Sequence, residues 1–158
     1  VRAIVRAGIP VMGHIGLTPQ TVSQLGGYRI QGKTAVAAKS LVKDAMALQD
    51  AGCFALVLEA VPDTVAALIT KRLAIPTLGI GAGVACDGQV LVYHDMLGLY
   101  DRLQPRFVKE YGQIGEAIKT AVQSYTEDVR NRQFPTDAHT YPMDAEEEAA
   151  FLAAMAGR

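Results

Sequence analysis

The sequence lacks the features that mark several classes of protein. Its 15 lysines and arginines are balanced by 16 aspartates and glutamates, so there is no surplus positive charge to neutralise a phosphate backbone. The longest apolar runs, such as residues 54–58, fall far short of the roughly 20 residues that a membrane helix needs. We therefore expect neither nucleic acid nor a membrane among its partners.

Cysteine is also scarce, and its placement argues against covalent cross-links. Cys53 and Cys86 lie far apart, there is no Cys-x-x-Cys, and the three histidines are scattered. Neither a disulfide scaffold nor a zinc module is indicated. Because no basic-then-apolar signal segment opens the sequence, we expect reduced thiols in a soluble, cytoplasmic protein. Its 158 residues, 50% hydrophobic and 20% charged, are typical of one globular domain.

Strand and helix patterns alternate along the chain. Apolar runs without polar alternation predict buried parallel strands, and apolar residues at helical spacing predict helices. The predicted strands are 9–16, 53–59 and 75–80, and the predicted helices are 35–49, 62–73 and 114–129. Residues 1–8 match the end of a helix that begins earlier, 17–34 a long loop, and 89–94 a fourth strand or a short helix.

This order of elements predicts an α/β fold, either an open doubly wound sheet or a (β/α)8 barrel. A complete barrel takes about 250 residues. A chain of 158 residues with four candidate strands could therefore form only about half of one. Both architectures place function at the carboxyl ends of the strands, where this sequence has His14, Glu59 and the glycine run 79–83.

Glu59 is the most informative of these residues, because it ends an apolar run and is followed by Ala60, Val61 and Pro62. Burial among such neighbours raises the pKa of a carboxyl group, which suits a general base or acid near neutral pH. The alternative is a glutamate that only caps the strand end. His14 ends the first strand in the same way and could bind a substrate carboxylate or carbonyl.

A buried histidine held by backbone groups is an equally good interpretation of His14. His94 and Asp95 are interpreted as structural. The glycine run 79–83 is not a dinucleotide fingerprint, because Val84 stands where a third glycine or alanine is needed. Its glycines allow either a ligand close to the backbone or a tight turn. Glu59 has no acidic neighbour at another clear strand end, so we expect any metal site to lie mostly outside this chain.

Five stretches together carry a family resemblance. They are 13–20 (GHIGLTPQ), 26–32 (GGYRIQG), 56–62 (LVLEAVP), 75–83 (IPTLGIGAG) and 87–95 (DGQVLVYHD). In this order they closely resemble the ketopantoate hydroxymethyltransferase family, and the resemblance runs from residue 1 to about Pro142.

The resemblance implies a (β/α)8 TIM barrel of the phosphoenolpyruvate mutase and isocitrate lyase group. Residues 1–142 would supply the fifth to eighth strands with the closing helices, and residues 143–158 a C-terminal extension that is a short helix or a tail. It also implies Glu59 as the proton acceptor, with His14, Gly79 and Gly81 in the substrate pocket. In the family, Mg2+ is held by carboxylates of the first half of the barrel, so no metal ligand is expected in this chain.

The implied reaction transfers a hydroxymethyl group from 5,10-methylenetetrahydrofolate to 3-methyl-2-oxobutanoate, giving 2-dehydropantoate for pantothenate and coenzyme A biosynthesis. The implied assembly is a homo-oligomer, decameric in many bacteria, and the chain alone is expected to be inactive without the N-terminal half. One alternative is a carbon–carbon lyase or mutase of the related barrels, which the loop at Gly26, Gly27 and Tyr28 disfavours. The other is a non-catalytic half barrel that serves as an interaction module, because its open edges and uncovered apolar face need a partner.

Overall fold

The chain forms an α/β structure with a parallel sheet. A computed structural model describes residues 1–18, 29–100 and 105–156. They form two compact units, 1–113 and 114–158, which are described separately. The elements of the first unit are α1 (Arg2–Arg6), β1 (Met12–Gly16), α2 (Ala35–Asp50), β2 (Ala55–Glu59), α3 (Asp63–Arg72), β3 (Thr77–Ile80), β4 (Gly88–Gln89) and α4 (Tyr93–Met96).

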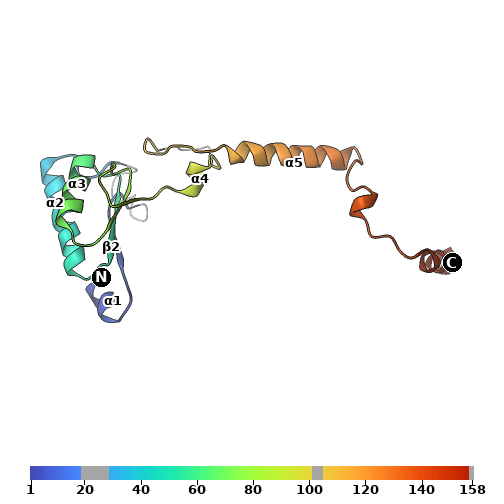
Figure 1. Cartoon of the computed structure of the whole chain (residues 1–158), viewed down its shortest axis with the longest axis horizontal. Coiled ribbons are helices and arrows are strands. Elements are labelled where there is room, and N and C mark those ends of the chain that lie inside the picture. Colours follow the sequence, from blue (N-terminus) through green and yellow to red (C-terminus); the bar gives the residue numbers. More distant parts are fainter. Residues whose placement is uncertain (19–28, 101–104, 157–158) are drawn as a thin grey trace. The chain divides into compact units, whose positions relative to one another are not determined.

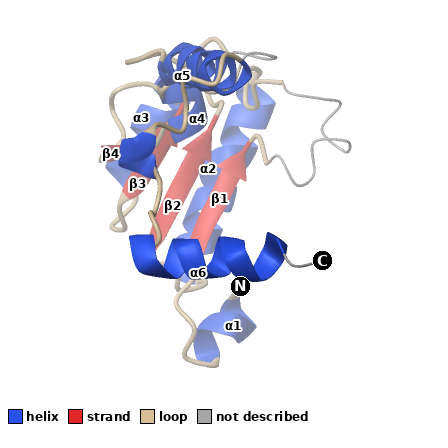
Figure 2. Cartoon of the chain, turned by 90° about the vertical axis from the view of Figure 1, so that its right-hand side faces the viewer, coloured by secondary structure: helices blue, strands red, loops and turns tan. Residues whose placement is uncertain are grey.

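The four strands lie side by side in the order β1-β2-β3-β4, and every neighbouring pair is parallel. Figure 2 shows β1, β2 and β3 with their arrowheads at the same end. In register, Gly16 of β1 pairs with Glu59 of β2, and Glu59 pairs with Ile80 of β3. The three predicted strand ends therefore meet at one edge of the sheet.

Among the residues described for the first unit, helices α2 and α3 cover one face of this sheet. Helices α2 and α3 pack together on the same side (Figure 1), and Leu56, Leu58 and Ile69 are buried between them and the strands. On the opposite face His14 and Val57 are only partly buried. An open doubly wound fold has helices on both faces of its sheet. The described residues of the first unit do not show this arrangement.

The predicted strands and helices of the first unit are confirmed, with small shifts at their ends. The segment 89–94 divides, because the two-residue strand β4 ends at Gln89 and the short helix α4 begins at Tyr93. The motif residues Gly26, Gly27 and Tyr28 lie outside the described residues.

Asp87 fixes the loop between β3 and β4. Its carboxylate accepts hydrogen bonds from the backbone N–H of Thr77, at 2.8 Å, and from the Thr77 hydroxyl, at 3.0 Å. These bonds favour the charged form and lower the pKa of Asp87 below its ordinary value.

The stability of the first unit should therefore depend on pH through Asp87. A lowered pKa stabilises the folded state above the ordinary value, and that contribution is lost as the pH falls through the lowered value. We expect Asp87→Asn to unfold at a lower urea concentration than the wild type at pH 7, and the difference to shrink as the pH falls below 3.8, the ordinary pKa of an aspartate. Asp50→Asn, at the exposed end of α2, removes the same charge without touching the Thr77 contacts and is the control.

The second unit contains α5 (Ile114–Arg130), the 3-10 helix η2 (Asp137–His139) and α6 (Ala145–Ala156). The ring of Phe134 contacts Tyr125 of α5 edge-on and also His139. The boundary at residue 142 stays a prediction. Within the described residues, no helix combines the length and apolar content needed to span a bilayer.

Candidate active site

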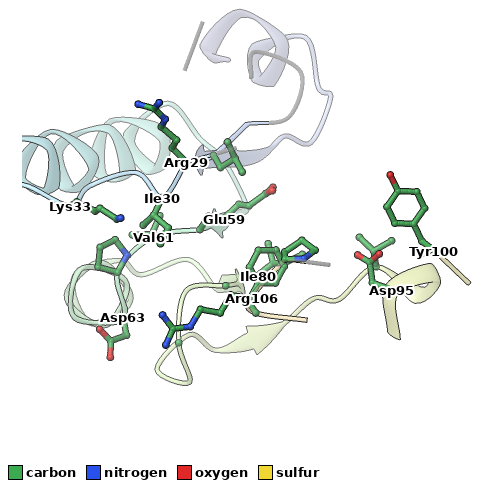
Figure 3. A pocket seen from close by; sticks show the side chains of 18 residues that line it. Arg29, Ile30, Lys33, Glu59, Val61, Asp63, Ile80, Asp95, Tyr100 and Arg106 are labelled. Atoms are coloured by element: carbon green, nitrogen blue, oxygen red, sulfur yellow. The ribbon is translucent and has the colours of Figure 1, made fainter. Parts of the chain in front are cut away.

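A cavity of about 1010 Å³ opens at the carboxyl ends of the strands. Glu59 and Ile80, the last residues of β2 and β3, line it together with Leu17, which follows β1. Figure 3 shows Glu59 next to Val61 and Ile80, with its carboxylate pointing away from Lys33 and Asp63. The cavity is therefore where parallel-sheet folds gather functional groups.

Glu59 has the properties of a proton acceptor. Its side chain is 14% exposed, and burial raises the pKa of its carboxyl group above the ordinary value. His14 nearby lowers this pKa in part, but burial has the larger effect. A carboxylate with a raised pKa is a stronger base than one in water, so Glu59 can remove a proton from a weakly acidic carbon.

His14 is the closest polar neighbour of Glu59. Its Nε2 atom lies 3.0 Å from Glu59 Oε2, close enough for an ion pair. The ring nitrogen is nevertheless out of line for a hydrogen bond, so the buried Nε2 has no aligned hydrogen-bond partner among the described side chains. His14 lines a second cavity of about 500 Å³ beside β1 rather than the larger one. The two predicted residues are thus brought together, with Glu59 facing the larger cavity.

Backbone hydrogen bonds hold the chain on both sides of Glu59. Its carbonyl oxygen accepts from the N–H of Leu17 at 2.8 Å. The next residue, Ala60, has a φ of 49°, donates to the Ile80 carbonyl at 2.9 Å and accepts from Gln31 N–H at 3.0 Å. An alanine in the left-handed region is conformationally costly and persists because these contacts fix it. They connect Glu59 to β1, β3 and the loop before α2, which sets the direction of its side chain.

The two predicted pocket glycines differ in position. Gly81 lines the cavity with Glu59, and a Cβ there would come within 2.5 Å of the Phe107 ring. Gly79 faces the other side of the sheet, where a Cβ would lie 2.9 Å from Cys86 Sγ. Gly81 therefore allows Phe107 to approach the cavity wall, and Gly79 allows the loop after β3 to pack on the strand.

Five charged residues of the cavity rim are not among the site residues predicted from the sequence. They are Arg29, Lys33, Asp63, Asp95 and Arg106. Asp95 had been interpreted as structural, yet it lines the cavity. Neither Lys33 nor Arg106 follows a predicted strand or belongs to a periodic apolar pattern, so no sequence signal marks either residue.

The described residues do not form a metal site by themselves. Among them, no three histidine, cysteine, aspartate or glutamate side chains gather in a group that could hold an ion. Glu59 and His14 are only a pair, and a hard cation needs more oxygen ligands than these supply. The acid–base chemistry of Glu59 is what this set of residues offers.

Comparisons with known proteins show the family of the chain. The sequence model of the family described as ketopantoate hydroxymethyltransferase matches residues 1–137. The chain is also similar to curated proteins named 3-methyl-2-oxobutanoate hydroxymethyltransferase. The one from Oleidesulfovibrio alaskensis is 60% identical over 149 residues, which cover 94% of this chain and 51% of the relative.

Two further relatives of the same name are similar over nearly all of this chain. The protein from Syntrophobacter fumaroxidans is 57% identical, with 98% of this chain and 55% of the relative covered. The protein from Carboxydothermus hydrogenoformans is 56% identical, with 92% and 53% covered. The chain spans about half the length of the curated relatives it matches. With most of its residues matched by the family and its Glu59 cavity at the strand ends, the chain belongs to the ketopantoate hydroxymethyltransferase family.

Proposed function

We propose that this chain supplies the proton acceptor for the transfer of a hydroxymethyl group to 3-methyl-2-oxobutanoate. The observation that carries the proposal is the buried Glu59 carboxylate, whose pKa is raised in a cavity at the strand ends of a member of this family. The product would be 2-dehydropantoate, a precursor of pantothenate. The one-carbon donor would be 5,10-methylenetetrahydrofolate.

In this reaction Glu59 takes the proton from the substrate carbon next to the keto group, leaving an enolate. The enolate carbon forms a bond with the methylene carbon of the donor, and the bonds from that carbon to the two folate nitrogens break. Water supplies the hydroxyl group, and the protons from the substrate carbon and from water end on the folate nitrogens. Apolar neighbours such as Val61 and Ile80 keep water away from Glu59 and so maintain its basicity.

We also propose that residues 1–142 are the second half of a (β/α)8 barrel, with 143–158 as an extension. Helices on one face of a parallel sheet and a partly exposed opposite face support this arrangement, since a barrel interior is filled only when the sheet closes. The other half would supply the carboxylates for Mg2+, which would polarise the 2-oxo group and so make the neighbouring carbon acidic enough for Glu59 to deprotonate. A cytoplasmic homo-oligomer, with ten subunits as one candidate, belongs to the same proposal.

His14 should tune the base rather than replace it. Because His14 lowers the pKa of Glu59 in part, His14→Gln should raise that pKa further. We expect the acidic limb of the kcat/KM profile to move to higher pH, while activity at high pH is largely retained. His139→Gln, at the exposed 3-10 helix of the second unit, is the control. A uniform loss at every pH would assign His14 a structural role only.

The proposed function is tested by completing the barrel. The 158 residues would be joined behind the preceding half of the Oleidesulfovibrio alaskensis relative and compared with the 158-residue chain alone. We expect 2-dehydropantoate to form from 3-methyl-2-oxobutanoate and the folate donor only with the joined protein. Transfer by the 158-residue chain alone would refute the dependence on the other half. A folded joined protein that turns over only a phosphoenol substrate would assign a lyase or mutase instead.

A further inference from the structure

Three cationic side chains border the cavity that contains Glu59. Arg29, Lys33 and Arg106 line its rim, and among the described residues none of them has an ion-pair partner. Two of the three acidic groups of the rim have a polar partner. Glu59 lies against His14, and Asp63 Oδ1 accepts the backbone N–H of Thr64 at 2.7 Å. The third acid, Asp95, belongs to α4. The three cations are therefore available to an anionic group of a ligand.

Lys33 and Arg106 belong to one continuous part of the rim, because the segments that carry them are linked by a series of close contacts. The first of these contacts is between the Lys33 loop and the start of α3. A Cβ on Gly32 would lie 3.7 Å from Pro62 Cδ, which places the Lys33 loop against the start of α3. Next along the rim, a Cβ on Gly83 would lie 2.7 Å from Asp63 Cβ. Finally, Phe107 beside Arg106 packs over Gly81.

This part of the rim lies away from the reacting end of Glu59. In the view of Figure 3, Lys33, Asp63 and the guanidinium of Arg106 are on one side of Glu59, and its carboxylate points to the other. Arg29 is at a different place on the rim (Figure 3). The Lys33 and Arg106 side carries one cation more than it has acids, so it favours an anionic group.

The rest of the lining is mostly apolar. Ile30, Val61, Ile80 and Phe107 give the cavity apolar walls, which suit an aromatic ring system. A ligand that fills the cavity would have a reacting group near Glu59, an apolar middle and an anionic end at Lys33 and Arg106. A tetrahydrofolate donor has these three parts, because its pterin and aminobenzoyl rings end in a glutamate with two carboxylates.

We propose that Lys33 and Arg106 bind the glutamate carboxylates of the folate donor, an assignment that rests on the proposed function. The 2-oxo acid is the other carboxylate ligand. Its carboxyl group is separated from the carbon to be deprotonated only by the keto carbon, so it must lie close to Glu59. Neither Lys33 nor Arg106 forms an ion pair with Glu59 in the described structure. The longer donor reaches the distant rim, and a donor with several glutamates gains further contacts there.

The test uses the joined protein described above with the double variant Lys33→Gln and Arg106→Gln. Its matched control is Lys43→Gln with Arg72→Gln, which removes the same charges from exposed positions outside the cavity. The KM is measured for the donor with three glutamates, for the donor without a glutamate tail and for 3-methyl-2-oxobutanoate. The dissociation constant of tetrahydropteroyltriglutamate is measured by calorimetry.

We expect the double variant to raise both constants of the triglutamate compounds by about 3- to 30-fold, the range for two partly exposed ion pairs. The KM values for the tailless donor and the 2-oxo acid should not change, nor should any constant of the control. An equal rise in the KM for the tailless donor, or a raised KM for the 2-oxo acid, would overturn the assignment of Lys33 and Arg106 to the glutamate carboxylates.

The same data separate this inference from the proposed function. Wild-type joined protein that transfers the hydroxymethyl group equally well from tailed and tailless donors would refute the glutamate subsite alone. Folded wild-type protein that neither transfers the group nor binds any tetrahydropteroyl compound would refute the proposed function, and the subsite with it.

Discussion

Replacing Glu59 by glutamine is expected to lower kcat for hydroxymethyl transfer by about 100- to 10,000-fold, the usual contribution of a positioned general base. Glutamine keeps the shape of the side chain and removes only its ability to accept a proton. The KM for each substrate should change little, because Glu59 acts on the proton being removed rather than on substrate binding. The joined protein and steady-state product formation provide the measurement.

Deuterium exchange isolates the step assigned to Glu59. In D2O without any folate, the enzyme should exchange the hydrogen next to the keto group of 3-methyl-2-oxobutanoate, and Glu59→Gln should lose this exchange together with transfer. Glu127→Gln, on the exposed surface of α5, is the matched control and should keep both. Exchange at the wild-type rate in Glu59→Gln would show that another group is the base.

Folding stability gives an independent check that Glu59→Gln is not simply unfolded. The raised pKa means that protonated Glu59 favours the folded state, and this contribution is lost as the pH rises from about 4.5 through the raised value. Glutamine does not ionise, so Glu59→Gln does not lose stability in this way as the pH rises. The variant should therefore have a thermal midpoint at neutral pH no lower than that of the wild type, while its activity is lost.

The parts of this site that follow from local sequence could be predicted, and those that depend on long-range packing could not. Glu59 follows an uninterrupted apolar run, so both the strand and the unusual carboxylate are visible in the residues themselves. His14 was placed by the rule that parallel strands end at one edge. Its Nε2 contact with Glu59 depends on the register between β1 and β2, which no pattern in either segment encodes.

Lys33 and Arg106 of the rim also depend on long-range packing, so the sequence alone could not place them at the cavity. Lys33 reaches the cavity because its loop packs on Pro62, and Arg106 because Phe107 packs on Gly81, about 25 residues earlier in the chain. Neither position has a hydrophobic period or a strand end to mark it. The left-handed conformation of Ala60 could not be predicted from the sequence either, because alanine is not a residue that indicates a positive φ.

Adding a single methyl group at Gly16 should disrupt the backbone contacts that hold Glu59 in place. Gly16 has a φ of 95°, and a Cβ there would overlap the Glu59 carbonyl oxygen. That oxygen belongs to the backbone and accepts the Leu17 N–H at 2.8 Å, so it cannot move without breaking the bond between the ends of β1 and β2. Gly16→Ala therefore combines an unfavourable φ with a backbone clash.

We expect Gly16→Ala to lower the free energy of unfolding by about 3 kcal/mol or more, the sum of a left-handed alanine and an overpacked contact. Gly8→Ala is the matched control, because Gly8 has a φ of 83° but nothing within 4 Å of an added Cβ. It should cost only about 1–2 kcal/mol, the contribution of the backbone conformation alone. Urea unfolding of the joined protein measures both values.

Equal losses of unfolding free energy in the two variants would mean that the Gly16→Ala clash is relieved at no cost in stability. In that case the Leu17 bond is not what holds Glu59, and deuterium exchange by Gly16→Ala should match the wild type. If the bond does hold Glu59, the surviving folded protein should exchange more slowly while still binding the 2-oxo acid.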